Sequence, residues 1–73
     1  MTHLPSVSGR ECIGAPVKVG FEVVRQKGSH IILRRNDPYA QIAVPDHREL
    51  DRGTLRGILR HASLDFDEFV DLL

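Results

Sequence analysis

A histidine that directly follows a glycine-containing turn is the residue in this chain best suited to chemistry. His30 comes after Lys27-Gly28-Ser29, and Arg34 follows four positions later. Histidine titrates near neutral pH, so an imidazole can take a proton from one oxygen and give a proton to another. Basic side chains nearby would bind a phosphate and stabilise its developing charge. We therefore predict that His30 is the catalytic acid or base, with these candidate substrate-binding residues: Lys27, Ser29, Arg34 and Arg25.

RNA is the substrate that suits this chemistry. It carries its own nucleophile, the 2′-hydroxyl, so backbone cleavage needs only proton transfer and stabilisation of charge on the phosphate, whereas DNA lacks that hydroxyl. One cysteine and four histidines do not provide the paired ligand spacing of a zinc site. The acidic residues are scattered, so a two-metal carboxylate cluster is also unsupported. The sequence predicts cleavage without a metal or other cofactor.

Each of these residues also has an ordinary structural interpretation. A lone histidine at the start of a strand is usually a surface residue, and Gly-Ser is common in turns. His47 is more typical of a loop or a hydrogen-bonding prop, and it is the secondary candidate for proton transfer. A set of arginines has the i, i+4, i+8 spacing of a solvated helix face, for which RNA contact is the minority interpretation: Arg52, Arg56 and Arg60. His3 and His61 belong to no such pattern.

The first expected element is a helix with an interrupted interior. Ser8 and Glu11 have the spacing of a capping box, which predicts that a helix begins just after Ser8 and ends at Gly20. Pro16 lacks an N–H group, and its ring would collide with a carbonyl one turn earlier. Together with Gly14, it predicts a bent or shortened helix.

Three strands should follow the first helix. Residues that favour β-structure are concentrated in three runs separated by short turn sequences: 21–26, 30–35 and 40–44. Side chains alternate between the faces of a strand, so Ile31 and Leu33 should share one face, opposite His30, Ile32 and Arg34. These runs predict a three-stranded antiparallel sheet.

Two helices should complete the chain. Apolar residues recur at helical spacing within 54–62, and Asp65 and Glu68 form a second capping-box pair before a short apolar segment. The order is α-β-β-β-α with a short extra C-terminal helix. An antiparallel sheet can bury one face under helices and leave the other exposed. We therefore predict a single α+β domain over residues 1–73, a two-layer sandwich.

Composition and charge restrict the ligands and the cellular location that we expect for this chain. The chain up to Arg60 carries ten basic and six acidic residues, a net charge of +4, and the remainder carries −4. A basic body can attract phosphate although the whole chain is neutral. The single Cys12 is expected to be a small buried residue. With no membrane-spanning run and no signal-peptide pattern, a cytoplasmic location without membrane association is expected.

The motifs also resemble a known family in their order and spacing. The blocks that carry the resemblance are Gly20-Phe21, the run from Arg25 to His30, Val44-Pro45-x-His47, and the run from Gly53 to Leu59. In this combination the chain resembles the HicA (YcfA-like) toxins from about Ser8 to Leu73. The resemblance implies a double-stranded-RNA-binding-domain-like fold and the activity of an mRNA interferase in a type II toxin–antitoxin system. It also implies an essential His30 and a HicB-like antitoxin that covers the active surface.

One segment departs from the pattern of that family, whose first helix usually carries leucine-like or helix-favouring residues where this chain has Cys12, Gly14 and Pro16. A proline inside a helix costs about 3 kcal/mol or more. The departure predicts a less stable domain, or one that relies on its partner. The leading hypothesis is thus an endoribonuclease toxin that uses His30. The alternatives are a non-catalytic RNA-binding module on the same basic sheet face and an element that binds only protein.

Overall fold

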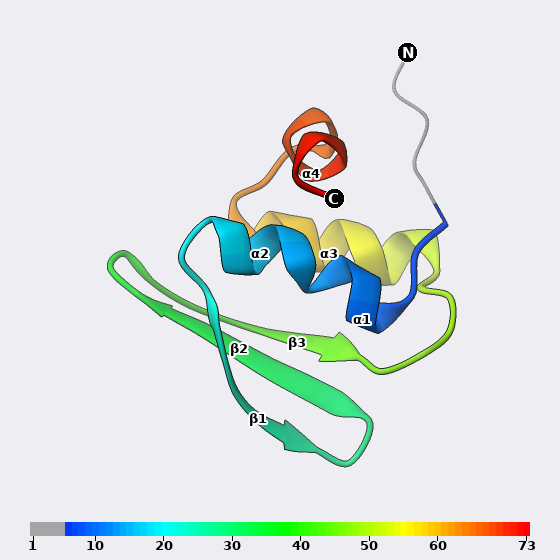
Figure 1. The fold of residues 1–73 in the computed structure, drawn as a ribbon, viewed down its shortest axis with the longest axis horizontal. Helices are drawn as coiled ribbons and strands as arrows, with labels where there is room; N and C mark the ends of the chain where they lie inside the picture. Colours follow the sequence, from blue (N-terminus) through cyan, green and yellow to red (C-terminus); the bar gives the residue numbers. More distant parts are fainter. Residues whose placement is uncertain (1–5) are drawn as a thin grey trace.

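The computed structural model describes residues 6–73, so His3 lies outside the described residues. It has the predicted α+β arrangement, with a three-stranded antiparallel sheet and helices on one of its faces (Figure 1). The elements in chain order are α1 (Gly9–Cys12), α2 (Gly14–Lys18), β1 (Glu22–Lys27), β2 (His30–Asn36), β3 (Tyr39–Pro45), α3 (Arg52–Ala62) and α4 (Phe66–Leu72).

The expected first helix is divided into two short helices. The capping box is present, because the Ser8 Oγ accepts a hydrogen bond from the Glu11 N–H at 3.0 Å and the Ser8 N–H donates to Glu11 Oε1 at 2.9 Å. α1 ends and α2 begins around Ile13, which caps both. Pro16 therefore lies in the first turn of α2, where a missing N–H breaks no helical hydrogen bond. The turn after α2 closes at Gly20, whose φ is +102°.

The sheet has the strand order β1-β2-β3, with both pairs antiparallel. A two-residue turn, Gly28-Ser29, joins β1 to β2, and Gly28 adopts a φ of +60° that favours glycine. Ile31 and Leu33 are buried, and so are Ile42 and Val44 on the neighbouring strand. Ile31 and Leu33 are the residues that alternation placed together on one face of the strand, and their burial confirms this prediction.

The hydrophobic core lies between the sheet and the layer formed by α1, α2 and α3 (Figure 1). Leu33 from the sheet and Leu55 from α3 are both fully buried in it. α4 lies on the far side of this helical layer from the sheet, where Phe69 is fully buried and the Lys18 Nζ donates a 2.7 Å hydrogen bond to the Leu72 carbonyl. The burial of these side chains supplies most of the favourable free energy of folding.

The strand β1 contributes no buried residue to this core, because all six of its residues are exposed. The outer face of the sheet is left open by the helices that residues 6–73 form (Figure 1). Within the same residues, every helix is too short or too polar to cross a membrane. The fold therefore presents an uncovered sheet face that carries the side chains alternating with the core residues.

Candidate active cleft

A cleft of about 380 Å³ lies between the edge strand β3 and helix α3. The sheet contributes one wall of it: His30, Gln41, Ile42, Ala43 and Pro45. The helix contributes the other: Gly53, Thr54, Gly57, Ile58 and His61. The predicted catalytic histidine thus lies in the wall of a cavity, and a second histidine lies in the same cavity.

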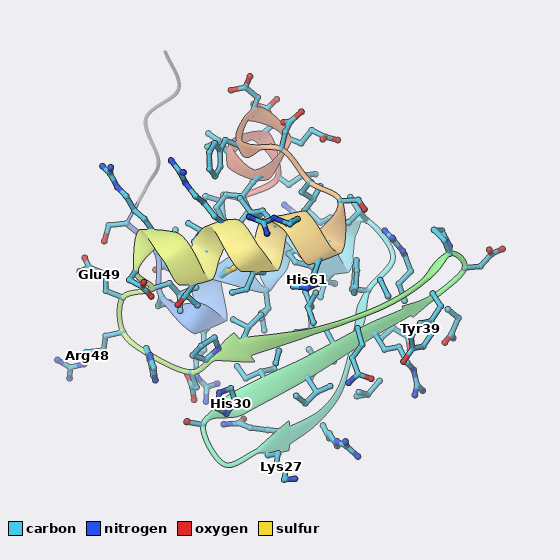
Figure 2. The ribbon with its side chains drawn as sticks, turned by 180° about the vertical axis from the view of Figure 1, so that it is seen from behind. Lys27, His30, Tyr39, Arg48, Glu49 and His61 are labelled. Carbon is cyan, nitrogen blue, oxygen red and sulfur yellow. The ribbon has the colours of Figure 1, made fainter. Side chains whose placement is uncertain are left out.

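The cleft is elongated along β3. His30 is the cross-strand partner of Pro45, and Arg34 is the partner of Gln41. These two pairs are four residues apart, which is roughly 13 Å at about 3.3 Å per residue. His30 therefore lies at one end of the cleft, and Arg34 is on the strand beside the other end. Figure 2 shows His30 at the start of β2 and His61 on the side of α3 that faces the sheet.

The turn before His30 is held by hydrogen bonds from both of its sides. The Gln26 Nε2 donates to the Gly28 carbonyl at 3.2 Å and to Asp46 Oδ2 at 3.4 Å. The Asp46 backbone N–H donates to the Ser29 carbonyl at 2.6 Å. The two residues before His30 are therefore tied both to β1 and to the chain that leaves β3. This arrangement fixes the backbone from which the His30 imidazole projects.

Asp46 extends this hydrogen-bonded network to the first helix. Its carboxylate accepts two hydrogen bonds from Arg10, from Nε to Oδ1 and from Nη2 to Oδ2, both at 3.1 Å. The Arg10 side chain is 71% exposed, so the ion pair contributes at most about 1 kcal/mol to stability. Its two-pronged geometry nevertheless orients the carboxylate that contacts Gln26. Sequence reasoning missed this network because Arg10 and Asp46 are 36 positions apart.

The start of α1 packs directly against the end of β3. The Gly9 N–H donates to the His47 carbonyl at 2.9 Å. A Cβ atom at Gly9 would lie only 1.9 Å from the Pro45 carbonyl oxygen, so only glycine fits at this position. This close approach holds Pro45 in place opposite His30. The first helix therefore supports the end of the cleft at which His30 lies, although it contributes no side chain to the cleft wall.

The predicted substrate-binding residues are spread along the outer part of the sheet. Lys27 is exposed and is the cross-strand partner of His30, so the two are direct neighbours. Arg34 is exposed on β2, toward the opposite end of the cleft. Arg25 is exposed on β1, opposite Ile32. The structure thus brings Lys27 next to His30 and separates both arginines from it by several residues.

His47 and the arginine stripe lie outside the cleft. His47 is exposed on the loop after β3, and only its backbone carbonyl takes part in the contact with α1. Arg56 and Arg60 line a separate cavity of about 370 Å³ between α3 and the start of α4. There the Arg56 guanidinium lies 5.6 Å from the centre of the Phe66 ring. The stripe is turned about 100° around α3 from the residues that line the cleft, because each arginine precedes a cleft residue by one position.

His61 is the cleft residue that the sequence analysis left without a role. Its Nδ1 atom is 2.8 Å from the Gly57 carbonyl oxygen. A carbonyl oxygen can only accept a hydrogen bond, so Nδ1 carries the proton in this contact. The Nε2 atom is then left to contact a ligand. The sequence contains one signal for this position, the i, i+4, i+8 spacing of Gly53, Gly57 and His61, and that spacing alone does not indicate which surface the residues face.

Groups of three or more acidic, histidine or cysteine side chains that could bind a metal ion do not occur within residues 6–73. Cys12 is buried between the helices and the sheet, and burial raises the pKa of its thiol to about 11. It is therefore a neutral core residue at physiological pH, as expected. The side chains in the cleft wall that can exchange protons are the two histidines, His30 and His61.

Comparison with known proteins identifies a family for this chain. The family model described as the HicA toxin of bacterial toxin–antitoxin systems matches residues 9–64. This chain belongs to the HicA toxin family. No curated protein matches the sequence in a similar comparison. As a HicA toxin, the chain is the toxin component of a toxin–antitoxin system, and the family implies a cognate antitoxin as its partner. The matched residues run from the start of α1 to just beyond α3, so they include both walls of the cleft, whereas α4 lies outside the match.

Proposed function

We propose that this HicA toxin is an endoribonuclease that cleaves mRNA and uses His30 as its general acid or base. The observation that carries the proposal is the position of His30 at the end of an open cleft, with Lys27 directly opposite on the neighbouring strand. A proton-transfer group and a phosphate-binding group are thereby adjacent at a surface that a nucleic acid strand can reach. Membership of a toxin family supports a reaction that damages the cell.

The proposed reaction uses the nucleophile of the substrate. The 2′-oxygen attacks the adjacent phosphorus, the bond from phosphorus to the 5′-oxygen breaks, and a cyclic phosphate and a free 5′-hydroxyl result. One proton must leave the 2′-hydroxyl, and one must reach the departing oxygen. His30 exchanges a proton at one of these two oxygens, which accelerates such reactions by roughly a hundred- to ten-thousand-fold. Lys27 stabilises the negative charge that develops on the phosphate. No step requires a metal ion.

The other predicted residues have more peripheral roles in this proposal. Ser29 positions the start of β2 next to His30, because its carbonyl oxygen accepts a hydrogen bond from the Asp46 N–H. Arg34 and Arg25 bind phosphates farther along the RNA, since both are exposed and neither is a cross-strand partner of His30. His47 remains the candidate for the second proton transfer from the loop beside the cleft. The cognate antitoxin, a HicB-like protein, would inhibit the toxin by covering this cleft.

The decisive experiment compares purified wild-type protein with His30→Ala in a cleavage assay on a labelled single-stranded RNA, with and without EDTA. We expect the wild type to cleave in EDTA and the variant to lose at least a hundred-fold in rate while it still binds RNA. Tyr39→Ala is a matched control, because Tyr39 is 67% exposed on β3 and outside the cleft. Circular dichroism and thermal unfolding check the fold of each variant.

Two outcomes would contradict the proposal. Equal cleavage by His30→Ala would show that His30 is not the catalyst. RNA binding without cleavage by the wild type would instead support the alternative of a non-catalytic RNA-binding module. A third outcome, loss of wild-type activity in EDTA, would show that cleavage requires a metal ion and would leave the role of His30 unchanged.

A further inference from the structure

We propose that His61 binds the RNA strand at a nucleotide other than the cleaved one, through a hydrogen bond between its Nε2 atom and a ribose 2′-hydroxyl. The inference rests on the proposed function. It adds a second contact with the RNA strand, in the same cleft as His30 but away from the bond that is cleaved. Its basis is that His30 and His61 line the same cavity from opposite walls and at different positions along it.

The direction of α3 determines where along the cleft His61 lies. The chain leaves β3 at Pro45 and enters α3 at Arg52, so the helix begins near the His30 end and runs toward the other end (Figure 2). From Gly53 to His61 there are eight residues, which is roughly 12 Å along a helix. Six covalent bonds join neighbouring phosphates of one strand, so even a fully extended nucleotide is shorter than this distance. The strand therefore extends over more than one nucleotide between the two histidines.

The hydrogen bond from Nδ1 to the Gly57 carbonyl determines what His61 can recognise. When the ring is neutral, the proton on Nδ1 leaves a lone pair at Nε2, which can accept a hydrogen bond. Among the backbone groups of nucleic acids, only the 2′-hydroxyl of RNA is a donor to such an acceptor, and DNA has none at this position. His61 is thus oriented toward a group that distinguishes RNA from DNA.

The helix wall between the histidines leaves room for the strand. Gly53 and Gly57 face the cleft without side chains. A Cβ atom at Gly57 would have no neighbouring atom within 4 Å, so the space beside the helix is open. Arg34 lies on β2 beside the end of the cleft that is farther from His30, where its positive charge would attract a phosphate of the strand. Catalysis at one end and recognition at the other would then occur in one continuous cleft.

The test compares two substrates: an all-RNA hexanucleotide and a chimera in which every nucleotide except the one cleaved lacks the 2′-hydroxyl. For the wild type we expect kcat/KM to fall about three- to tenfold on the chimera, which is the usual value of one neutral hydrogen bond. His61→Ala should cleave the all-RNA substrate at the reduced level and show no further loss on the chimera. His61→Gln, which keeps an acceptor oxygen, should recover part of the difference. Arg60→Ala is the control, since Arg60 is next in sequence but outside the cleft.

The outcomes separate this inference from the proposed function. If His30→Ala retains full activity, the proposed function fails, whatever His61 does. If His61→Ala matches the wild type on both substrates, His61 does not contact the strand. If His61→Ala loses kcat equally on both substrates, or remains as sensitive to the missing hydroxyls as the wild type, the assigned contact is wrong. Thermal unfolding of His61→Ala confirms that the helix persists.

Discussion

Replacement of Gly57 by alanine should make the protein more stable and less active at the same time. Gly57 lies inside α3, and its side of the helix forms part of the cleft wall. Its φ is not in the left-handed region, and an added Cβ would meet no atom within 4 Å. Alanine therefore fits without strain, and its methyl group would occupy space that we assign to the RNA strand.

The size of each effect follows from these two facts. Glycine inside a helix is about 1 kcal/mol less favourable than alanine, and with no clash most of this difference should appear as added stability. For a domain of this length, 1 kcal/mol corresponds to a rise in Tm of roughly 4 to 8 °C. A methyl group that obstructs a binding pocket costs about 1 to 3 kcal/mol, and the low end is appropriate for an open cleft. We therefore expect kcat/KM for RNA to fall about fivefold.

The assay combines thermal unfolding with cleavage of a labelled RNA. The matched control is Gly14→Ala in α2, where an added Cβ also meets nothing within 4 Å but the position lies outside the cleft. The control should retain wild-type activity. Higher stability of Gly57→Ala with unchanged cleavage would refute the assignment of this cleft to RNA. A lower Tm would instead refute the conclusion that the helix accepts a side chain at this position.

Two further predictions concern the packing of α1 against β3 and the buried thiol of Cys12. Gly9→Ala should lower stability by at least about 2 kcal/mol in chemical unfolding, because its Cβ would lie 1.9 Å from the Pro45 carbonyl oxygen; stability equal to that of the wild type would show that α1 does not pack as described. Burial raises the pKa of the Cys12 thiol from 9.0 to about 11, so the thiol of the unfolded chain ionises first as the pH rises. The stability that this thiol contributes is complete below pH 9, and about 2 kcal/mol of it should be lost by pH 11. Cys12→Ala should lack this part of the alkaline loss, and a parallel decline in both proteins would contradict the assignment.

The local elements of this fold could be predicted from the sequence because their signals are local. The capping boxes at Ser8 and Asp65 begin helices where their spacing indicated. Ile31 and Leu33 share the buried face of the sheet, as alternation predicts, and the first helix is divided into α1 and α2. Each of these features depends on residues within a few positions, where backbone sterics and hydrogen bonding act directly. The family resemblance was confirmed by the match to the HicA family over residues 9–64.

The sequence also singled out His30, but only the tertiary structure shows the surroundings of this residue. The cleft exists because α3 packs beside β3, which brings His61 into the same cavity. The turn before His30 is held by Asp46, and Asp46 is oriented by Arg10 from the other end of the chain. The stripe that begins at Arg52 has a regular spacing in the sequence, yet the rotation of the helix directs it away from the cleft. Sequence spacing determines which residues share a face, whereas packing between distant segments decides what that face meets.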